Sequence, residues 1–77
     1  MSTEMQVRKI ISETVEGFDG DSIKLDAPFL DAGLDSLDMA SVLLGVQEEL
    51  GAEVPEGDED KYDTLEKLVA FVDANKG

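Results

Sequence analysis

The 77-residue sequence contains no cysteine and no histidine. Without cysteine, neither disulfides nor thiolate metal ligands can stabilise the fold, which fits a reducing compartment. Without either residue, the Ser-His and Cys-His nucleophile pairs and the commonest general base at neutral pH are excluded. Carboxylates are plentiful, but acid catalysis by a carboxylate needs an apolar cleft that so short a chain has little room to build. We therefore expect a protein that is not an enzyme.

Basic residues are scarce as well. Lys and Arg number 6 against 19 Asp and Glu, which gives a net charge of -13, and residues 25–60 contain no base. Such a surface repels nucleic acid and anionic lipid and favours partner proteins with basic surfaces. Long apolar runs are missing too: no window approaches the ~20 apolar residues of a membrane span, and the first residues lack the apolar core of a signal peptide. We expect a monomeric, cytoplasmic protein.

The acidic runs lack the patterns of metal and nucleotide sites. Asp19-Gly20-Asp21 and Asp58-Glu59-Asp60 suggest calcium, but neither continues with the oxygen ligands and terminal Glu of an EF-hand loop. A Gly-rich phosphate loop is absent, because Gly17 and Gly20 stand among acidic residues that would repel phosphate. We expect no metal site and no nucleotide site.

What the sequence does contain is enough apolar material for one small folded domain over residues 1–77. Hydrophobic residues make up 42 % of the chain, with only 2 Pro and 7 Gly to interrupt them. Apolar residues at helical spacing predict helices over residues 4–16, from about 36 to 50, and from 63 or 64 to about 75. Residues 53–62 contain a short helical turn in this interpretation. The fold class is all-α: a small bundle of three main helices plus one short helix, with a long loop between the first and second helices.

Several details of this bundle are predictable. Thr3 and Gln6 have the spacing of a capping box at the start of the first helix, and Gly51 is a natural end for the second. In the long loop, the apolar residues expected to pin it to the core are Ile23, Leu25, Phe29 and Leu30. In the second helix, the apolar series expected to face the core is Met39, Leu43, Val46 and Leu50.

A Gly-Leu-Asp-Ser-Leu-Asp segment, residues 33–38, lies where the loop meets the second helix. A serine at this point exposes its hydroxyl, and a phosphodiester on it would face the positive end of the helix dipole. Alternatively, Ser36 or Asp35 is simply the N-cap of the helix. Spacing alone favours the cap.

Taken together, these residues resemble the acyl carrier protein family. The resemblance covers nearly the whole chain and includes Asp35-Ser36-Leu37 after a glycine, an apolar helix that ends in Glu48-Glu49-Leu50-Gly51, and then Val54-Pro55. It implies that a phosphopantetheinyl transferase uses coenzyme A to attach 4'-phosphopantetheine to Ser36. The thiol of this cofactor would carry acyl groups as thioesters, and Asp35 would help to position the metal and coenzyme A of the transferase.

The resemblance also implies where partners and cargo bind. Family members dock on the basic surfaces of synthase enzymes along their second helix, and the corresponding residues here are Asp35, Leu37, Asp38, Met39, Leu44 and Glu48, with Glu56 beyond them. Members that enclose their cargo hold it between helices. The corresponding residues are Val46, Tyr62 and Leu68, which ordinary core packing explains equally well.

Some residues depart from the fatty-acid form of the family. Ser41 and Gln47 replace acidic residues of the docking helix, and Gly45 interrupts that helix at a cost of ~1 kcal/mol relative to Ala. Residues 29–33 are also one residue shorter than usual before the Asp-Ser-Leu. The expected function is therefore an acyl carrier for fatty-acid or polyketide-like synthesis, with two alternatives: an aminoacyl or peptidyl carrier, or an acidic helical adaptor in which Ser36 is a mere cap.

Overall fold

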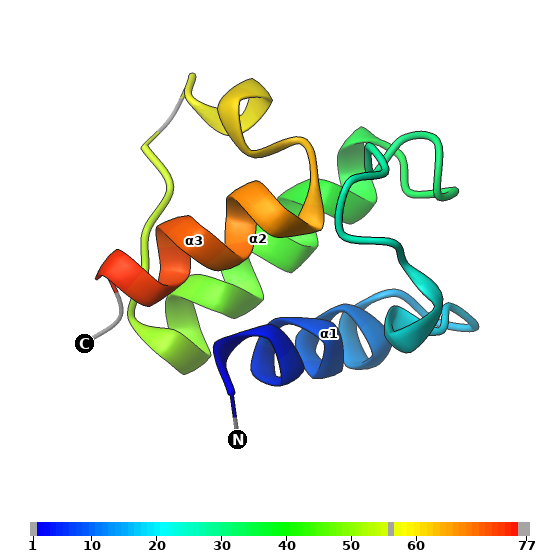
Figure 1. Cartoon of the computed structure of the whole chain (residues 1–77), viewed down its shortest axis with the longest axis horizontal. Coiled ribbons are helices and arrows are strands. Elements are labelled where there is room, and N and C mark those ends of the chain that lie inside the picture. The colour runs from blue at the N-terminus through cyan, green and yellow to red at the C-terminus, as the bar shows by residue number, and fades with distance from the viewer. Residues whose placement is uncertain (1, 56, 76–77) are drawn as a thin grey trace.

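The structure, a computed structural model, describes residues 2–55 and 57–75 and is built from helices (Figure 1). Between residues 3 and 75 the elements are α1 (Thr3–Thr14), the 3-10 turn η1 (Gly20–Ser22), α2 (Ser36–Leu50), the 3-10 turn η2 (Glu59–Tyr62) and α3 (Leu65–Asn75). The predicted all-α bundle with a long first loop is confirmed. Among the described helices, none has the length and apolar character needed to cross a membrane.

The first helix is the central packing element. α1 packs against both α2 and α3, while η1 lies on α1 and η2 on α3. The start of α1 and the end of α3 are joined by a 2.7 Å hydrogen bond from the Thr3 hydroxyl to Asp73 Oδ1. The end of the long loop and the start of α2 lie together at the other end of the bundle, on the right in Figure 1.

Each main helix contributes a stripe of buried side chains to one core. In α2 the stripe is centred on Val42 and Val46, whereas Met39, Leu43 and Leu50 of the predicted series are only partly buried. The apolar arc of α2 is wider than one core contact needs, so periodicity alone could not fix which part of it faces inward. The buried apolar side chains are Val7, Ile10, Ile11, Ile23, Phe29, Leu34, Val42, Val46, Ala52, Leu65, Leu68 and Val72.

The helix ends are set by caps. α2 ends as predicted at Gly51, whose left-handed backbone (φ 74°) lets its N–H donate to the carbonyl of Gln47. The cap predicted for α1 was wrong by one residue: Ser2, rather than Thr3, accepts a hydrogen bond from the N–H of Met5. Thr3 lies inside the helix, where its hydroxyl is used for the contact with α3.

Gly45 has a packing role in α2. A Cβ at this position would lie 3.0 Å from Ile10 Cγ2 and 3.4 Å from Thr14 Oγ1, both on α1. The glycine therefore allows α1 and α2 to approach closely. This contact explains why the helix contains a residue of low helix propensity.

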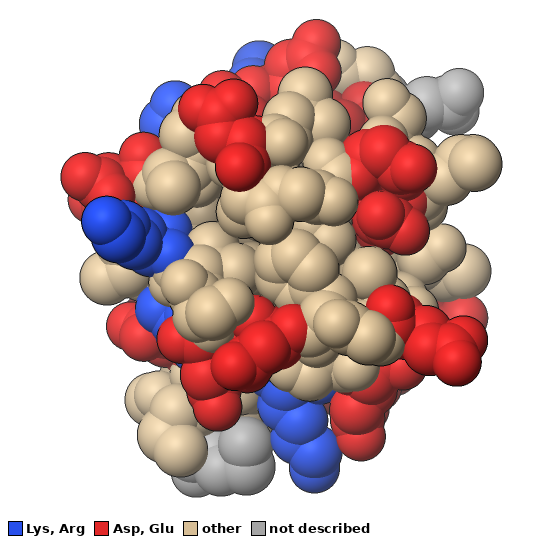
Figure 2. Space-filling model, turned by 90° about the vertical axis from the view of Figure 1, so that its right-hand side faces the viewer, with Lys and Arg blue, Asp and Glu red and all other residues tan. Residues whose placement is uncertain are grey.

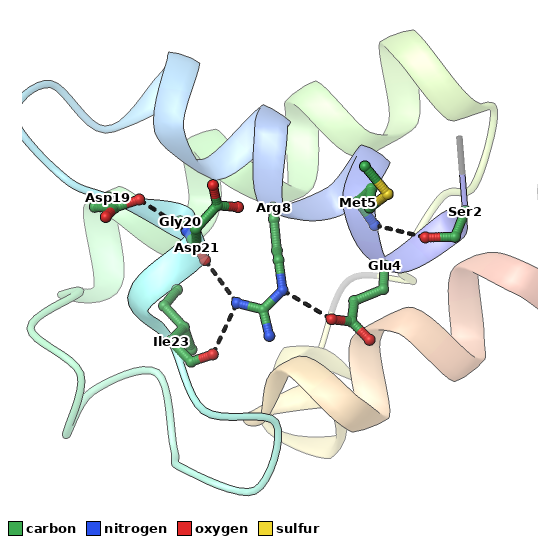
Figure 3. A network of polar contacts seen from close by, with 8 residues as sticks. All are labelled: Ser2, Glu4, Met5, Arg8, Asp19, Gly20, Asp21 and Ile23. Atoms are coloured by element: carbon green, nitrogen blue, oxygen red, sulfur yellow. Dashed lines mark hydrogen bonds and ion pairs between the residues drawn. The ribbon is translucent and has the colours of Figure 1, made fainter.

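Arg8 holds the first part of the long loop against α1. Its guanidinium donates from Nη1 to the carbonyls of Gly20 and Ile23, both at 2.8 Å, and from Nε to Glu4 Oε2 at 3.0 Å (Figure 3). The N–H of Gly20 donates in turn to the Ser12 hydroxyl at 2.8 Å. A Cβ on Gly20 would collide with the backbone oxygen of Arg8, so this approach requires glycine.

The second part of the loop is tied to the start of α3. The N–H of Phe29 donates to the carbonyl of Asp63 at 2.8 Å, and the N–H of Glu66 donates to the carbonyl of Leu25 at 3.0 Å. Ile23 and Phe29 are buried as predicted, but the predictions for Leu25 and Leu30 were wrong, because both side chains are exposed. Leu34, near the end of the loop, is buried although the sequence analysis did not predict it.

Candidate functional site

Ser36 is the first residue of α2 and is exposed, and its hydroxyl makes no hydrogen bond with any described residue. The cap of the helix is Asp35. Its Oδ1 accepts from the N–H of Asp38 at 2.8 Å, and Asp38 Oδ2 accepts from the N–H of Asp35 at 3.3 Å, which together form a capping box. Two aspartates therefore cap α2, and the serine hydroxyl between them is left available.

Most other serine hydroxyls of the described chain are occupied. Ser2 caps α1, Ser12 accepts from Gly20, and Ser22 donates to the carbonyl of Asp19 at 2.7 Å. Ser41 resembles Ser36 in being exposed and without a hydrogen bond to a described residue, but it lies in the middle of α2. A free hydroxyl and a helix start thus coincide at Ser36.

The start of α2 presents an electrostatic contrast around this hydroxyl. The backbone N–H groups of Ser36 and Leu37 have no acceptor among the described residues, and the helix dipole adds partial positive charge there. Each capping carboxylate uses one oxygen in the box, so Asp35 Oδ2 and Asp38 Oδ1 have no hydrogen-bond donor in the described part of the chain. An anionic group on the hydroxyl would face the amides, and a cation would face the carboxylates.

A cavity of about 570 Å³ opens beside Ser36, between α2, the loop at residues 28–30, Val54 and residues 59–63. This volume lies within the range of small-molecule sites in proteins. Most of its wall is apolar. The lining residues are Pro28, Phe29, Leu30, Ser36, Met39, Ala40, Leu43, Leu44, Gln47, Val54, Glu59, Asp60, Tyr62 and Asp63.

The three residues suggested by the sequence for a cargo pocket lie in different places. Tyr62 lines the cavity, and its ring packs on Phe71 with centroids 4.6 Å apart. Val46 and Leu68 are fully buried in the core and do not line the cavity. Leu43, rather than Val46, lines the cavity. The buried stripe of α2 contains Val46, and the neighbouring side of the helix, which contains Leu43, faces the cavity.

The outer face of α2 displays apolar side chains among acids. Leu37 is 79 % and Leu44 is 54 % exposed, and their helical spacing places Glu48 on the same face. Asp38 is half-buried in the capping box, and Met39 lines the cavity, so these two lie at the edge of that face. Glu56 lies outside the described residues.

The sequence analysis missed one exposed apolar residue near Ser36. Leu30, expected in the core, is 66 % exposed and lines the cavity together with Leu44. Figure 2 views the molecule from the end where the loop and the start of α2 lie, and shows acidic side chains around a central uncharged area, with basic groups at the margin. Within residues 2–55 and 57–75, no three acidic side chains converge in the manner of a metal site.

One comparison with known proteins bears on this geometry. A family model described as "Phosphopantetheine attachment site" matches residues 6–72. The match runs from α1 into the last turns of α3 and includes the capping box, Ser36 and all residues that line the cavity.

Proposed function

Since the chain belongs to the phosphopantetheine attachment site family, we propose that it is an acyl carrier and that Ser36 is its attachment residue. The family shows that the chain is a carrier protein with covalently bound 4'-phosphopantetheine. Carrier domains of this kind are generally not catalytic. The bound group supplies a terminal thiol that holds acyl groups as thioesters.

The assignment of Ser36 rests on one observation at the start of α2: the aspartates cap the helix and the serine does not. Both Ser36 and Asp35 are candidates for the N-cap on sequence grounds, and a capping serine would have its hydroxyl engaged. Asp35 and Asp38 form the cap instead, so the Ser36 hydroxyl is exposed and unbonded within the described chain. A phosphodiester on this oxygen would lie at the amide end of α2, where the dipole favours an anion.

Asp35 fits a role in the attachment reaction alongside its role as a cap. Capping uses Oδ1, and Oδ2 accepts no hydrogen bond from a described residue. We propose that this second oxygen helps to position the metal ion and coenzyme A of the phosphopantetheinyl transferase. The same carboxylate would then fix the helix start and orient the transferase on the neighbouring serine.

The outer face of α2 supports a proposal for partner docking. Leu37 and Leu44 would contact synthase enzymes, Glu48 and Asp38 would attract their basic surfaces, and Leu30 would extend the contact beyond the helix. Long-range attraction between the acidic carrier and a basic enzyme raises the association rate, while the exposed leucines determine the fit. Cargo on the arm would be within reach of the cavity beside Ser36.

The test is intact-protein mass spectrometry after incubation with coenzyme A and a broad-specificity phosphopantetheinyl transferase. We expect the mass of one phosphopantetheine to be gained and peptide mapping to place it on Ser36. Ser36→Ala should remove the gain completely while circular dichroism remains helical. Ser41→Ala is the matched control, because it removes the other exposed, unbonded serine of α2 and should leave the gain intact. Modification of the Ser36→Ala protein would show that the residue is misassigned, and no gain in any variant would favour the acidic adaptor.

A further inference from the structure

The cavity beside Ser36 has a mostly apolar lining, and the charged residues of this lining are all acidic. Glu59, Asp60 and Asp63 line it, and none of the described Lys and Arg residues does. The remaining polar residues of the lining are Ser36, Gln47 and Tyr62. A group inside would therefore meet apolar side chains on most sides and negative charge where the segment 59–63 forms the wall.

The two nearby lysines form ion pairs with some of these acidic residues but not with others. Lys67 Nζ lies 3.2 Å from Asp63 Oδ1, and Lys61 Nζ lies 3.4 Å from Asp58 Oδ1. Neither ammonium pairs with Glu59 or Asp60 by these contacts. Glu59 Oε2 accepts one hydrogen bond from the N–H of Gly57, and Asp60 has no hydrogen bond or ion pair with a described residue. Two acidic residues of the lining, Glu59 and Asp60, thus have no ion-pair partner among the described residues.

From this lining we infer that the cavity binds acyl groups that carry a cationic amine, of the aminoacyl class, in preference to acyl groups that end in a carboxylate. The inference rests on the proposed attachment at Ser36. The apolar wall would contact the carbon chain of the cargo, and the carboxylates of Glu59 and Asp60 would attract its ammonium. A carboxylate-ended cargo would be repelled by the same two groups.

Because the cargo is tethered to the protein, even a weak preference for a cationic group should be measurable. Glu59 and Asp60 are exposed, so each contributes only a modest, salt-screened attraction. Ser36 itself lines the cavity, so a group held on its arm is present at the high effective concentration of an intramolecular ligand, on the order of millimolar for a short flexible tether. The charge preference should therefore appear in loaded protein and diminish at high salt.

The experiment loads the full chain with stable cargo mimics through the transferase. Three coenzyme A analogues carry chains of equal length, joined by an amide in place of the thioester and ending in an amine, a methyl group or a carboxylate. Intact mass verifies loading before each thermal melt. At low salt we expect the amine-loaded protein to melt highest and the carboxylate-loaded protein lowest, with a gap of about 4 °C, the size expected for one favourable surface ion pair in a small domain.

The matched variants separate the cavity from the overall acidity of the protein. The double substitution Glu59→Gln and Asp60→Asn removes the two lining carboxylates that lack an ion-pair partner among the described residues, and it should reduce the gap by at least half. The control, Glu13→Gln with Asp21→Asn, removes two exposed acids on α1 and η1, outside the cavity, and should keep the gap. In about 1 M salt, where the Debye length falls to about 3 Å, the gap should nearly vanish in the unsubstituted protein.

Two failures have different meanings. If intact mass shows no loading, the proposed function is wrong, and the inference about cargo falls with it. If all three mimics load and melt together, or if the control pair reduces the gap as much as the cavity pair does, the carrier role stands and the cargo inference is overturned. Amide NMR shifts upon amine loading should include Leu43 and Tyr62 on the cavity wall, and shifts confined to the far side of α1 would equally overturn it.

Discussion

At the scale of single residues, Arg8 connects helix and loop through one side chain. Its side chain is only 13 % exposed, and it satisfies two backbone carbonyls of a segment that has little regular structure of its own. Buried carbonyls without a donor cost free energy, so the loop depends on this guanidinium. The dense Gly-Asp sequence that follows α1 is therefore ordered by a residue that precedes it by twelve positions or more.

Arg8→Met tests this role. The substitution keeps most of the apolar stem and removes the donors to Gly20 and Ile23, so we expect the free energy of unfolding to fall by about 2 kcal/mol. Urea denaturation followed by circular dichroism measures the change. Lys9→Met is the control, since Lys9 is an exposed neighbour without such contacts, and it should change the free energy of unfolding by less than about 0.5 kcal/mol. Equal losses in the two variants would show that Arg8 acts through charge alone.

At the scale of secondary structure elements, Gly45 sets two effects in α2 against each other. Alanine has a higher helix propensity than glycine by ~1 kcal/mol, which favours Gly45→Ala. Its Cβ would lie 3.0 Å from Ile10 Cγ2 in a buried interface, where side chains can yield little. The contact with α1 should therefore determine the sign of the effect.

We expect Gly45→Ala to lower the melting temperature in spite of its better propensity. Ser41→Ala offers the comparison within the same helix, because Ser41 is exposed and gains propensity without a new contact. That control should raise the free energy of unfolding by about 0.5 kcal/mol. If Gly45→Ala stabilised the protein more than Ser41→Ala, the close approach of α1 and α2 would not be what requires glycine.

The outer face of α2, proposed above for docking, contains acids that differ in their structural role. Asp38 belongs to the capping box, so its reversal to Lys would weaken the helix as well as any docking. Glu48→Lys is the cleaner test, because Glu48 is exposed and outside the box. We expect it to slow association with the transferase several-fold at low salt in stopped-flow experiments, and to do so much less at high salt. Glu13→Lys on α1 makes the same change in net charge, and an equal effect there would exclude specific docking through Glu48.

The sequence predicted an element well where residues close to it in the chain determine it, and poorly where distant residues do. The limits of α2 were predictable because both ends carry local signals, Asp35 and Ser36 at the start and Gly51 at the end. The turn η1 was not predicted, because three residues are too few to show a period, and contacts from Arg8 and Ser12 hold it in addition to the local cap by Asp19. Backbone hydrogen bonds from the loop to α3 leave no sequence signal either.

The candidate site shows the same division. The motif located Ser36 and Asp35, but it could not decide which of them caps the helix, since both residue types do so. The walls of the cavity depend on how α2 is rotated about its axis in the bundle. That rotation buries Val46 and turns Leu43 to the cavity, and apolar periodicity does not distinguish between the two.

At the scale of the whole molecule, like charges lie close together. The chain has a net charge of -13 and measures 29 × 28 × 21 Å. The ion pairs found within the described residues join positions three or four apart, so they tie no distant elements together. Repulsion among the remaining acids opposes folding, and it acts across the entire molecule when the Debye length is about 30 Å, as in 0.01 M salt.

Salt should therefore stabilise the folded state. Between about 0.01 M and 0.1 M NaCl the Debye length falls to about 10 Å, and we expect the melting temperature to rise by about 5 °C and then to level off. Magnesium chloride should produce the same rise at lower concentration, because a divalent ion screens more strongly. Thermal melts by circular dichroism measure both. A melting temperature that ignores salt in this range would show that repulsion among the acids is already relieved in the folded chain.

The capping of α2 by aspartates also bears on repeated use of the protein. The Ser36 hydroxyl supports no described part of the fold, so an ester can form or be cleaved there without breaking a hydrogen bond of the folded chain. Attachment and removal therefore leave the hydrogen bonds that cap α2 in place. If Ser36 is the attachment residue, as proposed above, one copy of the chain can receive its group, lose it and receive another without refolding.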